Sequence, residues 1–164
     1  MINVSDKAPL GRMLAVFLGL LILANIVLAV IGYAFPDLPI PSSMGIILAM
    51  VAAMSAGQSA TKAVNRRLRV GEKVTFALTA TALSAALGVG LFWAMFAWFG
   101  VPFTLDNVIL AASGDTVPPA DLRQILAWVI PIVLVVYVLI TYFGAAMDSR
   151  NQIKLQEKLA GKAR

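Results

Sequence analysis

The chain has 164 residues, of which 60% are hydrophobic and only 13% are charged, with a formal net charge of +5. A soluble domain carries about 25% charged residues, so the composition favours an all-α polytopic membrane protein over a soluble one. Cysteine and histidine are absent, which excludes disulfides, thiol redox chemistry, iron–sulfur clusters and His-ligated haem within this chain, and leaves zinc only carboxylate ligands. We therefore expect no cofactor and no metal site.

Residues 13–34 predict the first membrane-spanning helix. The run is free of charges and exceeds the roughly 20 residues needed to cross a bilayer. It is also longer than the apolar region of a signal peptide, about 7–15 residues, so we expect it to remain uncleaved. Asn25 lies near its centre, and we expect that side chain to hydrogen-bond to a neighbouring helix.

A proline-rich connection follows, after which Ser42 or Ser43 is expected to cap the next helix.

The second span, predicted at 44–64, carries a row of small residues at four-residue spacing. Small side chains at this spacing let two helix backbones approach closely in a membrane. The first row comprises Gly45, Ala49, Ala53, Gly57 and Thr61, and a second row comprises Ala52, Ala56 and Ala60. The alternative is that alanine is simply common in membrane helices; five consecutive small positions favour a packing face.

The third span, predicted at 74–99, has a small row of its own: Ala82, Ala86, Gly90 and Ala94. A short basic loop joins it to the second span, with Val70 and Gly71 expected to make the turn. Glu72 is expected to pair with one of Arg66, Arg67 or Arg69. Because both spans carry small faces, we expect them to form the tightest helix pair. Gly57 and Ala53 would then lie opposite Ala86 or Gly90.

Residues 100–124 form the longest predicted connection. Thr104 is a suitable cap for a short helix at 105–113, which is apolar enough to lie on the membrane surface as an interfacial helix. The fourth span is predicted at 125–147, with Pro131 inside it. Good helix formers continue to about residue 159, so the last helix is expected to extend into the polar tail at 148–164.

The distribution of basic residues predicts the topology. Of the 13 lysines and arginines, twelve lie in the N-terminal segment, the 62–73 region and the tail, and one, Arg123, lies in a connection predicted to be outside. Basic residues favour the cytoplasmic side. We therefore predict a single membrane domain, 1–164, with four spans and both termini in the cytoplasm.

Basic side chains on the predicted cytoplasmic face form a possible docking surface. The set comprises Arg66, Arg67, Arg69, Lys154, Lys158 and Lys162. Such a cluster can bind anionic lipid or an acidic partner, or it can act only as a topology signal. Its position beside apolar runs favours lipid over nucleic acid, and no nucleic-acid partner is expected.

Groups able to carry catalysis or transport are scarce in this sequence. Transport and proton relay usually leave ionisable residues inside the bilayer, and none lies in the middle of a predicted span. Pairs such as Ser55 and Lys62, or Ser59 and Lys62, resemble a serine–lysine arrangement, but Lys62 falls where the positive-inside loop already requires a base. We do not expect an enzyme.

The leading functional hypothesis is a non-catalytic membrane protein that acts by association. It would work in the bilayer as an accessory subunit of a larger complex or as a homo-oligomer. The alternative is a small transporter or channel component that forms a pathway only on oligomerisation.

Two short motifs carry a family resemblance. The second span ends in Ala56-Gly57-Gln58, and after the basic loop Gly71-Glu72-Lys73 opens the third span, followed by Phe76-Ala77. This layout resembles small four-helix inner-membrane proteins of proteobacteria. The resemblance implies a bacterial inner-membrane location and supplies no catalytic residues.

Overall fold

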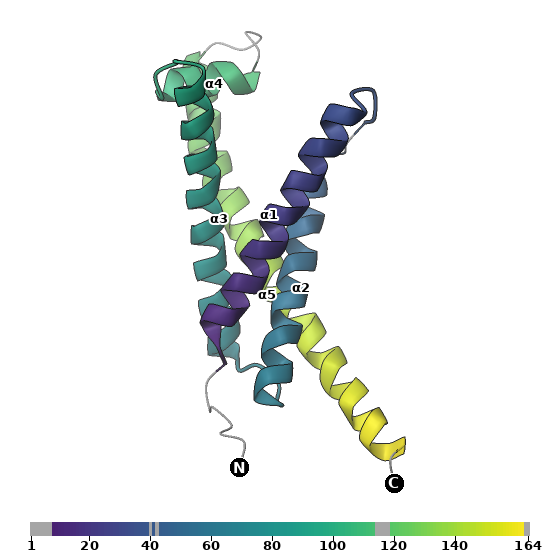
Figure 1. Ribbon diagram of the computed structural model, residues 1–164. Coiled ribbons are helices and arrows are strands. Elements are labelled where there is room, and N and C mark those ends of the chain that lie inside the picture. The colour runs from purple at the N-terminus through teal and green to yellow at the C-terminus, as the bar shows by residue number, and fades with distance from the viewer. Residues whose placement is uncertain (1–7, 40, 42, 114–118, 163–164) are drawn as a thin grey trace. The chain divides into compact units, whose positions relative to one another are not determined.

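The computed structural model describes residues 8–39, 41, 43–113 and 119–162. These residues form five helices, and four of them are long and apolar enough to cross a membrane, which indicates a multi-pass membrane protein. The helices are α1 (Leu10–Ala34), α2 (Met44–Val64), α3 (Val70–Trp98), α4 (Leu105–Ser113) and α5 (Pro119–Lys162) (Figure 1). The predicted all-α class is confirmed.

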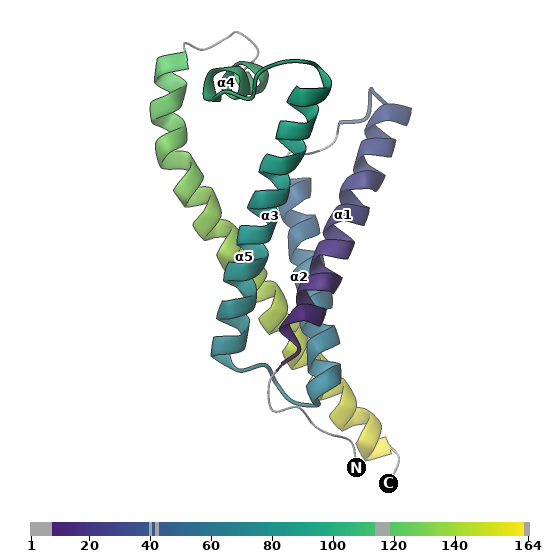
Figure 2. The same cartoon turned by 60° about the vertical axis from the view of Figure 1, so that its left-hand side comes forward.

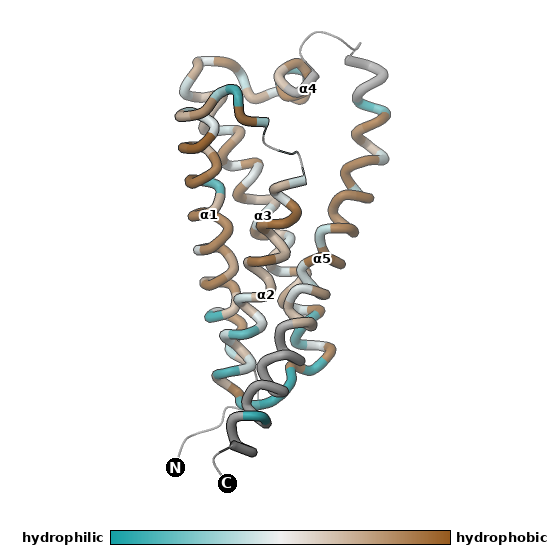
Figure 3. Tube along the Cα trace, turned by 90° about the vertical axis from the view of Figure 1, so that its right-hand side faces the viewer, coloured by the Kyte–Doolittle hydropathy of each residue, from teal (hydrophilic) through white to brown (hydrophobic). Residues whose placement is uncertain are grey.

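The helix bounds agree closely with the sequence-based expectation, except that α1, α3 and α5 begin earlier, at Leu10, Val70 and Pro119 rather than at 13, 74 and 125. Helices α2 and α4 match the predicted ranges, and α5 continues without interruption from Pro119 to Lys162, as expected for a last helix that extends into the tail. Pro131 lies inside α5. Apolar residues cover most of α1 and the described middle of α5, whereas hydrophilic residues gather near the α2–α3 connection (Figure 3).

The α2–α3 connection differs from the prediction. Helix α2 ends at Val64 and is followed by the C-cap residue Asn65, whose backbone is left-handed (φ 50°) and whose N–H donates to Thr61 O. Asparagine tolerates this conformation better than most residues. Val70 and Gly71 belong to the first turn of α3, so the predicted turn at these residues is wrong. The reason is local: Glu72 accepts a hydrogen bond from the Arg69 backbone N–H at 2.8 Å, as in a capping box, and starts the helix earlier.

The expected caps had different outcomes. Ser43 precedes α2 but makes no side-chain capping hydrogen bond, and Ser42 lies outside the described residues. Thr104 does cap α4, because its hydroxyl oxygen accepts from the Asn107 N–H at 3.3 Å. The cap prediction is thus confirmed for Thr104, whereas Ser43 makes no such bond.

The chain divides into two compact units. The first comprises Met1–Thr81 and Tyr137–Arg164, and the second comprises Ala82–Val136. In the first unit α1 and α2 pack side by side (Figures 1 and 2). The core is made of alanines with a few large side chains among them: Phe17 of α1 meets Phe76 of α3 edge-on, with 5.7 Å between ring centroids.

Helices α2 and α5 approach each other closely in the first unit. A β-carbon at Gly57 would lie 2.6 Å from the carbonyl oxygen of Ala145 and 2.8 Å from its Cα. The contact is reciprocal, since a β-carbon at Gly144 would lie 3.0 Å from both Ala53 Cβ and Met50 O. These distances leave no room for a side chain at Gly57, so glycine is what allows the two backbones to touch.

This contact corrects the prediction that Gly57 and Ala53 pack against Ala86 or Gly90. Their partners are Ala145 and Gly144, while Ala82, Ala86 and Gly90 are exposed. The small residues of α3 that are buried lie nearer its start, at Ala77 and Ala80. The missed signal was present in the sequence, because Thr141 and Ala145, with Gly144 beside them, form a small face on the fourth span.

Within the second unit, the chain turns sharply after α3. Gly100 has a positive φ of 66° and donates to Ala97 O, while Val101 donates to Phe96 O. This pair of bonds is the Schellman arrangement, which requires the left-handed conformation that glycine adopts readily. It directs α4 across the end of α3 (Figure 2), and Phe103 then packs edge-on against Phe96 at 5.8 Å.

Gly57→Ala is expected to destabilise the protein. Alanine normally gains about 1 kcal/mol over glycine within a helix, but here its methyl group would overlap Ala145, and overpacking costs about 1–3 kcal/mol. Gly45→Ala is the matched control, since it lies in the same helix and a β-carbon there meets nothing within 4 Å. We expect Gly57→Ala to lower the melting temperature in detergent and Gly45→Ala to leave it unchanged or raise it. Equal melting temperatures for the two variants would contradict the close contact.

Candidate functional site

The carboxylate of Glu72 links three segments of the first unit. Its Oε1 accepts from the Ala8 N–H at 2.9 Å and from Arg66 Nη2 at 2.7 Å. Its Oε2 accepts from Arg66 Nη1 at 3.0 Å and from the Arg69 N–H at 2.8 Å. The Arg66 pair is bidentate, the geometry that makes guanidinium–carboxylate bonds strong and directional. Glu72 therefore ties the segment before α1 and the α2–α3 connection to the start of α3.

The pairing of Glu72 with one of the three loop arginines was expected, and Arg66 is that partner. The contact with Ala8 was missed, because a backbone N–H carries no signal in a sequence. Both charged side chains are half-buried, with 26% of Arg66 and 18% of Glu72 exposed. Partial burial reduces screening by water and salt, so this ion pair is expected to contribute more than a fully exposed one.

A pocket of about 440 Å³ lies beside this carboxylate. It opens between the start of α1 and the start of α3 and is lined by Ala8, Leu10, Met13, Arg69, Gly71, Glu72 and Thr75. One side is apolar and the other presents Arg69 and the engaged Glu72. A pocket that combines these two surfaces suits an amphiphilic ligand.

The predicted basic surface is only partly available for binding. Arg67 and Arg69 are exposed, whereas Arg66 is bonded to Glu72 and to the Arg67 carbonyl oxygen. Lys158 is exposed, and the side chains of Lys154 and Lys162 lie outside the described part of the structure. Lys73, also in the first unit, lies over the Tyr142 ring of α5 at 5.6 Å from the centroid, within cation–π range.

The predicted packing residues also fall into two groups. Ala49, Ala53 and Gly57 are buried, as a packing face requires, whereas Gly45 at the start of the row is exposed. Asn25 differs from the expectation of an interhelical bond: it is exposed, and its Nδ2 donates to Leu21 O of its own helix at 2.7 Å. An amide in an apolar helix can satisfy itself in this way without a partner helix.

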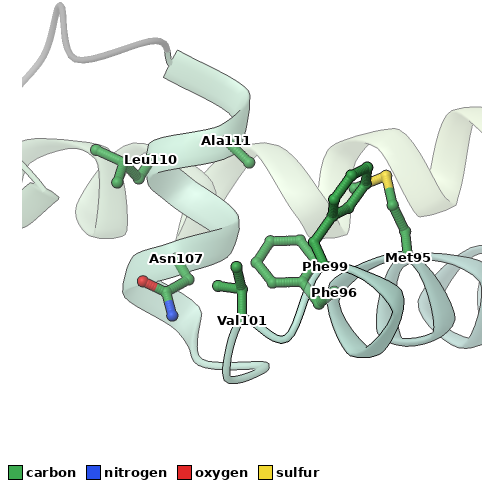
Figure 4. A pocket seen from close by; sticks show the side chains of 7 residues that line it. All are labelled: Met95, Phe96, Phe99, Val101, Asn107, Leu110 and Ala111. Atoms are coloured by element: carbon green, nitrogen blue, oxygen red, sulfur yellow. The ribbon is translucent and has the colours of Figure 1, made fainter.

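A second pocket, of about 340 Å³, lies in the second unit where α4 faces the end of α3. Figure 4 shows Met95 and Phe96 reaching it from α3, and Leu110 and Ala111 from α4. Phe99, Val101 and Asn107 complete the lining, and the Asn107 amide is engaged, since its Nδ2 donates to Pro102 O at 2.7 Å. The pocket is therefore apolar and offers no group suited to chemistry.

An ion pair joins α4 to the start of α5. Arg123, near the start of α5, donates from Nε and Nη2 to the Asp106 carboxylate. Both side chains are more than half exposed, so the pair contributes orientation more than stability. It holds α4 against the start of α5 within the second unit.

Two buried hydroxyls remain without a hydrogen-bond partner among the described residues. They are Thr61 Oγ1 of α2 and Thr81 Oγ1 of α3. Thr141 shows the usual solution inside a helix, since its hydroxyl donates to the carbonyl oxygens of Tyr137 and Val138. No group of three or more acidic side chains among the described residues is placed to hold a metal ion.

Comparison with known proteins adds nothing to this geometry: no family model, curated protein or solved structure matches the chain.

Glu72→Ala is expected to weaken the first unit. The substitution leaves Arg66 without its carboxylate and removes the acceptor of two backbone N–H groups, and hydrogen bonds to charged groups contribute about 1.5–3 kcal/mol each. Asp37→Ala removes an exposed acid from the proline-rich connection and serves as the charge-matched control. A lower melting temperature in detergent is expected for Glu72→Ala alone, together with faster proteolysis before α1. Identical behaviour of the two variants would show that Glu72 is an ordinary surface acid.

Proposed function

We propose that this chain is a non-catalytic integral membrane protein that acts by lateral association in the bilayer. The observation that carries the proposal is the row Ala82, Ala86 and Gly90 on α3. All three are exposed, and a β-carbon at Gly90 meets nothing within 4 Å. The small face of α2 is occupied by α5, whereas this row leaves room for a helix from a second chain.

The exposed apolar surface supports the membrane part of this proposal. Large apolar side chains such as Leu91, Trp98 and Trp128 are 70%, 87% and 72% exposed. A protein in water rarely exposes continuous apolar surface on this scale, and a lipid bilayer covers it without cost. On this proposal the chain resides in a bacterial inner membrane, and α4 lies at the outer interface with Trp98 beside it.

The proposed orientation places both termini in the cytoplasm. It follows from the twelve-to-one distribution of basic residues. Reporter fusions after residue 164 and within the α2–α3 connection should give cytoplasmic signals, and fusions within 35–43 and 100–118 should give external signals. An external signal after residue 164 would overturn the orientation.

Gly90→Leu is expected to disrupt association without unfolding the chain. A leucine at Gly90 has space in the isolated molecule but would separate a partner helix packed on this face. Gly88→Leu is the matched control: it lies in the same helix, its β-carbon also meets nothing within 4 Å, and it projects away from the row. The measurement is cross-linking in native membranes, with the melting temperature in detergent as the folding control.

The expected result is a several-fold loss of cross-linked product for Gly90→Leu, with Gly88→Leu like the wild type. Cross-links between copies of this chain would identify a homo-oligomer, and cross-links to a different chain would identify an accessory subunit. If the two variants give the same products in the same yield, α3 is not the associating face.

A further inference from the structure

The pocket between the starts of α1 and α3 combines a cationic group with an apolar wall. We propose that it binds the phosphate headgroup of an anionic phospholipid, with Arg69 as the contact to the phosphate. The inference rests on the proposed membrane location, since it requires this end of the first unit to lie at the surface of a leaflet. It goes further by naming one ligand class and one binding residue.

The charge of the pocket is positive because its acid is already engaged. Each oxygen of Glu72 accepts two hydrogen bonds, and Arg66 compensates its charge through a bidentate pair. Arg69 contributes only its backbone N–H to this cluster. Its guanidinium has no hydrogen-bond or ion-pair partner among the described residues, so the charge of this pocket-lining arginine is not compensated by them.

Arginine is well suited to this task. Its planar guanidinium presents several N–H donors and binds phosphate oxygens in pairs. The pocket has space for a headgroup beside Arg69. Gly71, which also lines the pocket, has no side chain, and a β-carbon there would meet nothing within 4 Å. A headgroup can therefore approach the guanidinium without displacing protein atoms.

The apolar wall favours a lipid over a free phosphate. Leu10 and Met13 line the pocket where the apolar helix α1 begins. Val74, next to the pocket-lining Thr75 on the first turns of α3, is exposed, so an exposed apolar side chain lies near the pocket. A lipid can place its phosphate at Arg69 and its glycerol and acyl carbons against this surface, whereas inorganic phosphate would use the arginine alone.

The test uses the full chain purified in detergent and native mass spectrometry to measure bound lipid. The probe is phosphatidylglycerol, with diacylglycerol of the same chain lengths as the uncharged comparison. Arg69→Gln removes the proposed phosphate contact but keeps the backbone N–H that Glu72 needs. Arg67→Gln is the charge-matched control, because Arg67 is exposed in the same connection and does not line the pocket.

We expect wild-type protein to bind phosphatidylglycerol in preference to diacylglycerol. Arg69→Gln should weaken that binding about fivefold, the effect of losing one basic residue near an anionic lipid, and Arg67→Gln should leave it unchanged. Equal losses for the two variants would overturn the proposal, since they would indicate diffuse attraction. Competition by glycerol phosphate at the same concentration as the lipid would also overturn it, because the site would then take soluble phosphate.

A second variant keeps the test independent of folding. Gly71→Glu places an acid in the first turn of α3, where helices favour negative charge, so the fold is expected to be retained while the headgroup is repelled. Binding that survives Gly71→Glu would contradict the proposal. If lipid binding is absent while reporter fusions still place both termini in the cytoplasm, this inference alone fails. If the fusions reverse the orientation, the proposed function fails as well.

Discussion

The backbone contact between α2 and α5 is the constraint on which the first unit depends. Gly57 lies so close to Ala145 that even a methyl group would overlap it, and Ala53 meets Gly144 on the same interface. Helices in a membrane gain nothing from hiding apolar surface from lipid, so close van der Waals packing must hold them together. Small side chains make that packing possible, and the alanine-rich core of this unit follows from it.

Polar interactions in the first unit concentrate at one end, where the chain is expected to leave the bilayer. Glu72 joins Ala8, Arg66 and Arg69, and Lys73 lies over Tyr142 of α5. These contacts connect the segment before α1, the α2–α3 connection and α5 around the start of α3. The close packing and the polar junction thus involve different parts of the helices, and the pocket beside Arg69 lies at the polar junction.

The polar groups of the described residues differ in how far they are engaged. The carboxylates of Glu72 and Asp106 are each paired with an arginine, and the pocket beneath α4 is lined almost entirely by apolar side chains. Among the described residues, the row of small residues on α3 is exposed and the Arg69 guanidinium has no hydrogen-bond or ion-pair partner. Both features are suited to binding, one to another helix and the other to a lipid headgroup, and together they support the proposed association in the bilayer.

The sequence by itself determined the helices and, for α2 and α4, both of their ends, because uncharged runs of about 20 residues, prolines and caps such as Thr104 act locally. It also identified the small face of α2 and the ion pair of Glu72 with a loop arginine. Only the tertiary structure decided what each face contacts. The small rows of α2 and α3 were equally suited to packing, yet Gly57 packs on Ala145 and Gly90 stays exposed. Helix periodicity shows which residues share a face, but the partner of each face depends on how whole helices cross. The contact of Glu72 with the Ala8 backbone N–H could not be predicted, because every residue except proline carries a backbone N–H.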